Sequence, residues 1–360
     1  MPSMDDPALA DLIRRVEQTP LRDLVSVDIE EVQVHMDQLI RPDVDSASLY
    51  RRWEQQHWAV SDLDFSQDVQ HWQMLEPGIR QIIQATMTLF FLGEQAVTDT
   101  LSPLLHASPR EDERIFLSTQ VADEARHTVF FQRFFDEVLG VSGGIHAALA
   151  TLRPSARDGY RRVFDGQLTA ATDRVRREPE NQRAWVEGVV TYHLVIEGFL
   201  ALTGQRALLR VFRNIGLMPG FTAGFTAVAR DESRHIGFGV LALRRRVDED
   251  AENARVIARK VLELLEPAVM TIVGPDEPLP YEDPAAVPEP MRLNPLDIRE
   301  WAVDSLDKRL RACGLASATV DGIAVEARTL YEKAWDRYES LQGRRHPVRF
   351  FRSEAAAAAD

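Results

Sequence analysis

The sequence has little of several features that define common protein classes. Cys313 is its single cysteine, which excludes an internal disulfide, a cysteine-ligated iron–sulfur cluster and a dithiol mechanism. The formal net charge is −14 and no basic run is longer than residues 244–246, so we expect no nucleic-acid partner. The first residues lack the basic start and apolar block of a signal peptide. A reducing, cytoplasmic location is therefore expected.

Long hydrophobic runs are also missing. The most apolar long segment, residues 189–202, is too short to span a membrane and contains His193 and Glu197. We therefore expect no transmembrane segment.

Strand patterns are scarce, whereas helix signals are frequent. No run of strict alternation is long enough to predict a sheet, and residues 25–34 are the best candidate for a single short strand. Ser108 begins a capping-box pattern with Pro109 at the first helical position. Helices are expected over residues 108–139, 155–177, 181–204, 220–247 and 251–265. The predicted fold class is all-α.

The composition fits one enzyme-sized domain over residues 1–360. At 45% hydrophobic and 27% charged residues, the chain can bury a sizeable core. Eight of its 19 prolines fall within residues 267–295, which cannot be helical throughout. We expect this stretch to cross the surface of the bundle and to lead into two C-terminal helices, over 295–313 and 318–342. A flexible tail is expected over 352–360.

The most informative feature that is present occurs twice. Asp-Glu-x-Arg-His stands at residues 123–127 and again at 231–235, and each copy follows a lone Glu in an apolar stretch, Glu94 and Glu197. At 3.6 residues per turn, the Glu and His of each copy are three positions apart and share one helix face. The apolar neighbours indicate that this face is buried.

The charge of this set predicts bound metal. Burying four ionised carboxylates without partners is very unfavourable, whereas two divalent cations balance them. The alternative is a set of helix salt bridges with nearby arginines. A third copy of the spacing, Glu54 with His57, has a polar context and is assigned to a solvated helix face. The predicted ligands of a two-metal centre within residues 80–247 are Glu94, Glu124, His127, Glu197, Glu232 and His235.

Residues beside the ligands have expected supporting roles. A ligating histidine usually donates its other ring N–H to a carboxylate, and Asp123 and Asp231 are placed for that task. Arg126 and Arg234 either orient these carboxylates or face solvent. His193 is expected to be a core or supporting histidine and not a seventh ligand.

The ligand order from four helices is that of the ferritin-like two-metal carboxylate proteins. With Asp before each paired Glu, residues 49–247 resemble the small subunit of class I ribonucleotide reductase. The resemblance implies a ferritin-like helical bundle of that type and a homodimer.

Two further residues are similar to those of the small-subunit-like ligand-binding oxidases. Val97 and Tyr192 look like the pair that an ether bond joins in those proteins; their alternative reading is ordinary core packing. Val97 shares the helix face of Glu94, but Tyr192 lies about 140° from Glu197 on a regular helix. Tyr192 therefore needs either a long reach or a local π-bulge.

The oxidase resemblance implies the chemistry. It implies a heterodinuclear manganese and iron cofactor, with di-iron as the alternative, that activates O2 and forms the Val97–Tyr192 crosslink. It also implies a bound long-chain fatty acid or similar lipid, and oxidation of an apolar substrate.

Other functions remain open from the sequence. Phe131 stands where the radical-bearing tyrosine of the reductase subunit usually lies, and a radical-generating subunit with Phe there is the main alternative. Trp58 falls at the tryptophan of that subunit's radical-transfer path, although a core role is favoured. Metal storage and aryl-amine N-oxygenation are minor alternatives. The substrate, the product, the electron donor, the metal identity and the bridging carboxylate are not determined by the sequence.

Overall fold

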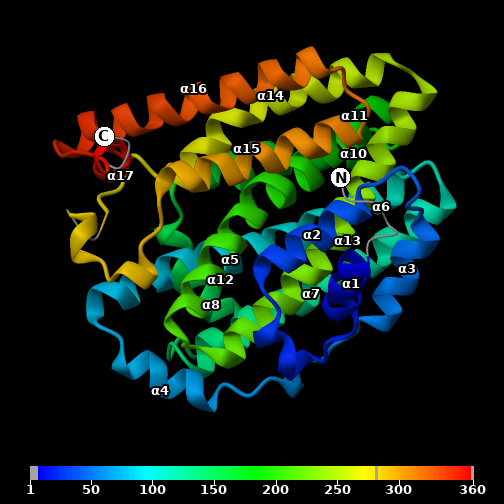
Figure 1. The fold of residues 1–360 in the computed structure, drawn as a ribbon. Helices are drawn as coiled ribbons and strands as arrows, with labels where there is room; N and C mark the ends of the chain where they lie inside the picture. The colour runs from blue at the N-terminus through cyan, green and yellow to red at the C-terminus, as the bar shows by residue number, and fades with distance from the viewer. Residues whose placement is uncertain (1–6, 280–282, 358–360) are drawn as a thin grey trace.

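The computed structural model describes residues 7–279 and 283–357 of the chain. Within these ranges the chain is helical with short connections and contains no strand (Figure 1). The all-α prediction is confirmed. The buried apolar side chains form one continuous core.

Four long helical segments make the centre of the bundle. They are α5 (Pro77–Thr100), α7 (Glu111–Glu137), the continuous run of α11 (Gln182–Val189), η5 (Val190–Ala201) and α12 (Leu202–Ile215), and α13 (Pro219–Glu249). α13 packs against η5 and α7, and α5 packs against α7. Every residue of α13 from Gly220 to Leu243 is buried, so its polar side chains must find partners inside the protein.

The remaining elements cover this centre. α14, α15 and α16 lie along one side of the view, and α1, α2 and α3 lie along another (Figure 1). Their bounds are α1 (Pro7–Gln18), η1 (Leu21–Ser26), α2 (Ile29–Leu39), α3 (Ser46–Gln55), η2 (Val60–Asp62), α4 (Ser66–Met74), α6 (Ser102–Ala107), α8 (Gly144–Leu152), η3 (Arg153–Ser155), α9 (Asp158–Arg161), η4 (Arg162–Leu168), α10 (Thr169–Arg177), α14 (Glu252–Val273), η6 (Pro284–Ala286), η7 (Glu289–Met291), α15 (Pro295–Ala312), α16 (Ser317–Gln342) and α17 (Val348–Ala357).

The short strand expected over residues 25–34 is wrong, because a helix starts inside it. Asp28 accepts a hydrogen bond from the Glu30 backbone N–H, and Glu31 accepts one from the Asp28 backbone N–H at 2.8 Å. This capping box begins α2, and its branched residues Ile29 and Val32 are buried on the helix.

The helix that carries the first motif starts later than expected. α7 begins at Glu111, with Arg110 as its N-cap. The Ser108 hydroxyl donates instead to the buried Glu113 carboxylate at 3.1 Å. A buried carboxylate needs donors, which explains why Ser108 does not cap the helix backbone.

The apolar segment around Glu197 belongs to a longer helical run than expected. The helix does not stop at residue 204 but continues to Ile215, where Gly216 adopts a positive φ of 63°. The run Gln182–Ile215 is long and apolar enough to cross a membrane by length and composition, but 89% of its most apolar part is buried in the protein. It is therefore a core helix.

The C-terminal part contains two departures from the sequence expectations. α14 runs through Pro267 to Val273 instead of ending near residue 265. α17 occupies residues 348–357, where we expected a flexible tail from residue 352, and residues 358–360 lie outside the described residues. The tail is helical here because His346 and Glu339 hold its start: Val348 N donates to His346 Nδ1, and Arg349 Nε donates to Glu339 Oε1. α15 and α16 lie where the sequence predicted helices.

Candidate metal centre

The structure brings the six predicted ligands together at the centre of the bundle. Each residue is at most 6% exposed, although the six come from α5, α7, η5 and α13. They form two groups in which the donor atoms lie within 4.8 Å of one another. The first group consists of Glu94, Glu124, His127 and Glu232, and the second of Glu124, Glu197, Glu232 and His235.

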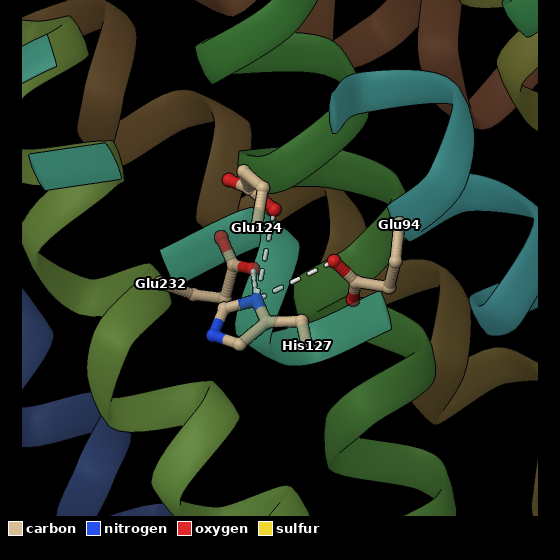
Figure 2. A group of neighbouring side chains, drawn as sticks. All are labelled: Glu94, Glu124, His127 and Glu232. Carbon is tan, nitrogen blue, oxygen red and sulfur yellow. Dashed lines mark ion pairs between the residues drawn. The ribbon is translucent and has the colours of Figure 1, made fainter. Parts of the chain in front are cut away.

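Glu124 and Glu232 belong to both groups. Each therefore offers carboxylate oxygens to both groups. Figure 2 shows the first group, in which His127 Nδ1 faces carboxylate oxygens from three helices. This nitrogen lies 3.4 Å from Glu94 Oε2, 3.5 Å from Glu232 Oε1 and 3.6 Å from Glu124 Oε2.

The second group is arranged in the same way around His235. Its Nδ1 lies 3.2 Å from Glu124 Oε1, 3.3 Å from Glu232 Oε2 and 3.5 Å from Glu197 Oε1. Both imidazoles thus turn the same nitrogen toward the shared carboxylates.

The electrostatics of the cluster favour added positive charge. Burial raises the pKa of Glu94 to about 8, although contact with His127 opposes this. Burial and the charge of Glu232 hold the pKa of Glu197 well above its usual value. Burial alone would lower the pKa of His127, but its carboxylate neighbours raise it well above the ordinary range. The raised pKa values show that positive charge is favourable in the cluster, and bound metal cations would supply it.

Two buried polar atoms indicate where cations fit. His127 Nδ1 and Glu197 Oε2 are buried within the cluster and have no hydrogen-bond partner among the described residues. Unpaired buried groups are costly, and a metal–ligand bond would satisfy both. Imidazole nitrogen with carboxylate oxygen suits iron and manganese, so the donor set fits a dinuclear centre of these metals.

The two motif aspartates support the histidines crosswise. Asp231 Oδ2 lies 3.2 Å from His127 Nε2, and Asp123 Oδ2 lies 3.1 Å from His235 Nε2. Each aspartate therefore fixes the imidazole of the other motif copy and leaves the Nδ1 atom facing the ligand cluster.

Each aspartate is also held by a tryptophan and by arginines. Trp58 Nε1 donates to Asp231 at 2.8 Å, and Trp53 Nε1 donates to Asp123 at 2.9 Å. Arg234, which is fully buried, donates to Asp123 at 2.9 Å and to Asp231 at 2.6 Å. Each of the two aspartates therefore accepts hydrogen bonds from one tryptophan and from Arg234.

Arg126 also contacts both aspartates, and it lies beside His57 of the third motif-like copy. Arg126 Nη2 donates to both Asp123 and Asp231, so it orients the carboxylates and does not face solvent alone. Its Nη1 lies 3.2 Å from His57 Nδ1. His57 and Glu54 are exposed and lie outside both ligand groups, as expected for a solvated face.

Tyr192 reaches the cluster because its helix is distorted. η5 is a π-helix, in which residues five apart are joined by a hydrogen bond and lie one above the other. Tyr192 therefore points the same way as Glu197, and its hydroxyl donates to Glu124 Oε1 at 2.7 Å. Burial and the charges of the surrounding carboxylates raise the pKa of Tyr192 well above its usual value, so the phenol keeps its proton.

His193 is not part of either ligand group. Its Nε2 lies 3.1 Å from Gln120 Oε1, and Gln120 Nε2 donates to Glu197 Oε1 at 2.9 Å. Burial lowers the pKa of His193 to about 3. Gln120 was not singled out from the sequence, although it lies four residues before Glu124 and therefore on the same helix face.

A cavity of about 590 Å³ opens from the ligand carboxylates. Val97 and Tyr192 both line it beside the ligand set, and most of its remaining wall is aliphatic or aromatic. Val97 is 5% exposed. The sequence contained no signal for this cavity, because its wall is assembled from segments far apart in the chain.

Comparison with known proteins agrees with this geometry. The family model of the ribonucleotide reductase small chain matches residues 42–271. A solved mutant of an R2-like ligand-binding oxidase with an anaerobically reconstituted Mn/Fe cofactor is 25% identical, with a TM-score of 0.65 over 76% of this chain and 94% of that one. The R2-like ligand-binding oxidase from Sulfolobus acidocaldarius is 23% identical, with a TM-score of 0.59 over 80% of this chain and 90% of that one, and shares the fold.

Proposed function

Since this chain belongs to the ribonucleotide reductase small-chain family, we propose that it is a dinuclear-metal oxidase that activates O2 and acts on an apolar, lipid-like substrate. The observation that carries the proposal is the cavity that begins at the ligand carboxylates and continues between apolar side chains. A site built only to hold a buried radical has no need of a space of this kind.

The metal ions would be held by the two ligand groups. Glu94 and His127 would bind one ion, Glu197 and His235 the other, and Glu124 and Glu232 lie where they can bind both. When bound, a redox-active pair of this kind supplies the electrons for dioxygen reduction. A mixed manganese and iron pair is proposed from the printed cofactor of the similar oxidase, with di-iron as the alternative because the same donors suit both metals.

Val97 and Tyr192 would form an ether crosslink during the first oxidation. The new bond joins the Val97 β-carbon to the Tyr192 oxygen, one hydrogen leaves each atom, and dioxygen accepts the two electrons. Support comes from the position of both side chains on the cavity wall next to the ligands. The hydrogen bond to Glu124 fixes the Tyr192 oxygen and offers an acceptor for its proton.

Peptide mass spectrometry tests the crosslink. Metal-free protein is loaded with manganese and iron, with and without air, and then digested. We expect a linked peptide pair containing Val97 and Tyr192, lighter by two hydrogens, only in air. Val97→Ala and Tyr192→Phe are the matched controls. Separate peptides from protein that binds both metals and consumes oxygen would overturn the crosslink.

A long-chain fatty acid or similar lipid would occupy the cavity. The apolar wall supplies the hydrophobic contact that an acyl chain needs. Native mass spectrometry of the purified protein, followed by organic extraction, should detect a lipid. Filling the cavity by Gly93→Leu should displace it. If Gly93→Leu retains as much lipid as the unaltered protein, the cavity is not the lipid site.

A radical-generating subunit is the second candidate, and one observation favours it. Trp58 is hydrogen-bonded to Asp231, which contacts His127, so a continuous path joins this tryptophan to the ligand cluster. Phe131 would stand in place of the radical tyrosine. A pull-down against a large reductase subunit discriminates: stable association and deoxynucleotide formation would replace the oxidase proposal.

A homodimer is proposed from the family resemblance. Ile115 and Val129 are 49% and 47% exposed on α7, an apolar surface that an interface could cover. Light scattering should give twice the chain mass, and Val129→Glu should shift it toward the monomer. Cytoplasmic location stays a prediction.

A further inference from the structure

One polar group on the cavity wall has no partner in the protein. The uncharged polar side chains on the wall are Thr86, Tyr160, Tyr192, Thr203 and Thr271. The three threonine hydroxyls donate to carbonyls of their own helical segments, and Tyr192 donates to Glu124. The Tyr160 hydroxyl makes no hydrogen bond with any residue in the ranges 7–279 and 283–357.

The Tyr160 side chain is held firmly in this place. The residue is 3% exposed, and its ring is stacked on that of Phe164, with the ring centroids 4.3 Å apart. The neighbouring Gly159 lets α9 approach α14 closely, because a Cβ at this position would lie 2.4 Å from the Thr271 backbone nitrogen. Tyr160 therefore has little freedom to turn toward another partner.

The hydroxyl is a donor that remains unused. Burial, with the charge of Asp165, raises the pKa of Tyr160, so the phenol keeps its proton. Asp165 accepts a hydrogen bond from Arg153 at 2.8 Å and not from the phenol. Because an unpaired polar group inside a protein costs free energy, a molecule in the cavity that offers an acceptor would relieve this cost.

Tyr160 lies in the part of the cavity next to the ligand cluster. η4, the segment that follows it, packs against α5 and η5, which carry Glu94 and Glu197. Phe164 of η4 lies 3.7 Å from the position of a Cβ on Gly93, the residue before Glu94. Glu76, by contrast, stands about five helical turns before Glu94 at the start of α5.

We propose that the Tyr160 hydroxyl determines specificity by donating a hydrogen bond to an oxygen atom on the chain of the substrate. The substrate class is then a long-chain acid with a hydroxyl or keto group close to its head. This rests on the proposed function, which puts a long-chain acid in the cavity, where its carboxylate suits iron and manganese as a ligand. With the head at the metal ions, the first carbons of the chain pass Phe164 and Tyr160.

A plain alkyl chain satisfies this wall less well. It would exclude water from the Tyr160 hydroxyl and offer no acceptor in return, which leaves a polar group unpaired. Sites built to hydrogen-bond a substrate group discriminate against the analogue that lacks this group. The discrimination should therefore depend on the hydroxyl and not on the ring, and Tyr160→Phe separates the two.

Calorimetric titration compares palmitate with palmitates that carry one hydroxyl or keto group at successive chain positions. Metal-loaded protein, freed of bound lipid, should bind at least one oxygenated acid about tenfold or more tighter than palmitate, as expected for one satisfied hydrogen bond. Tyr160→Phe should abolish this difference and leave the affinity for palmitate unchanged. Tyr331→Phe is the matched control and should keep the preference, because it removes another buried hydroxyl without a partner that does not lie on the wall.

Infrared spectroscopy reports the hydrogen bond independently of affinity. The keto band of the preferred keto acid, labelled with carbon-13 at that carbon, should lie at a lower frequency in the unaltered protein than in Tyr160→Phe. An identical band in both proteins would overturn this inference. Equal weakening of palmitate and of the oxygenated acids by Tyr160→Phe would also overturn it, because the hydroxyl would then bind the head group. If palmitate binds as tightly as every oxygenated acid, lipid binding stands and the role of Tyr160 fails; if no acid binds, the proposed function fails with it.

Discussion

At the scale of single residues, the crosswise support of the histidines determines how the two ligand groups depend on each other. Asp123 belongs to the first motif copy but contacts His235 of the second, and Asp231 contacts His127 of the first. Neighbours in sequence therefore act on different candidate ions. A defect in one motif should appear at the ion held by the other.

Asp123→Asn should weaken binding mainly at the position that includes His235. Its amide cannot fix the imidazole as the carboxylate does, and losses of about 10- to 100-fold in metal affinity are typical of such partners. Anomalous diffraction at the manganese and iron edges would give the occupancy of each position. Asp231→Asn is the reciprocal control, which should deplete the position with His127. Equal loss at both positions in both variants would contradict the crosswise arrangement.

His346 makes the C-terminal helix sensitive to pH. Burial, with the charges of Arg349 and Arg352, lowers the pKa of His346 to about 4, although Glu339 opposes the shift. The neutral ring is required because Nδ1 accepts a hydrogen bond from Val348 N at 3.1 Å. The unfolded chain therefore binds more protons than the folded chain between the two pKa values, so stability rises with pH across this window.

Stability should accordingly fall as the pH drops from about 6.5 to about 4, by roughly 3 kcal/mol at most from this group. His346→Asn keeps an acceptor near the position of Nδ1 but does not titrate. Urea unfolding at several pH values should show a smaller slope in this variant. An identical slope in both proteins would exclude His346 as the cause.

At the scale of elements, the π-helix η5 is the feature that places the reactive side chains. It brings Tyr192 and Glu197 to one face. η5 packs against α13, and these two side chains are hydrogen-bonded to Glu124 and Gln120 of α7. A π-helix is rare, and contacts from a neighbouring helix support this one. The Ser305 hydroxyl of α15 donates to the Gly198 carbonyl. Arg309 packs close to Gly198 and leaves little room for a larger residue there.

Ser305→Ala should destabilise the protein by about 1 kcal/mol, because the Gly198 carbonyl loses a buried hydrogen bond. Hydrogen exchange should rise in residues 190–201 more than in α7. Ser118→Ala is the matched control: its exposed hydroxyl bonds only to its own helix at Arg114 O, and its effect should stay within about 0.5 kcal/mol. Equal protection of η5 in both variants would show that Ser305 does not hold the π-helix.

At the scale of the whole molecule, the buried carboxylates connect metal binding to folding. Glu94, Glu124, Glu197 and Glu232 come from four segments that must converge before the ligand groups exist. The unfolded chain therefore lacks the site, and metals that bind only the folded chain stabilise it by mass action.

Metal loading should raise the melting temperature. At ligand concentrations near a thousand times the dissociation constant, the gain is about 4 kcal/mol. Calorimetry with and without a chelator would measure it. The increase should vanish in Glu124→Gln/Glu232→Gln, which removes both shared carboxylates, and persist in Glu54→Gln. If added metals leave the melting temperature unchanged, the proposed dinuclear centre is wrong.

The sequence by itself determined the helical fold and the six residues of the cluster. Both are local: a helix is specified by periodicity and capping, and Glu-x-x-His places two side chains on one face whatever surrounds them. Where local signals competed, at Asp28 and at Ser108, the sequence interpretation placed an element wrongly. At Asp28 a capping box forms and a helix begins. At Ser108 the hydroxyl donates to the buried Glu113 carboxylate and so does not cap the helix.

Only the tertiary structure decided which carboxylates lie between the two groups, which aspartate supports which histidine, and how Tyr192 reaches Glu124. Each of these pairs residues from helices far apart in the chain, so no spacing in the sequence encodes it. The cavity has the same origin, because its wall exists only after the helices pack.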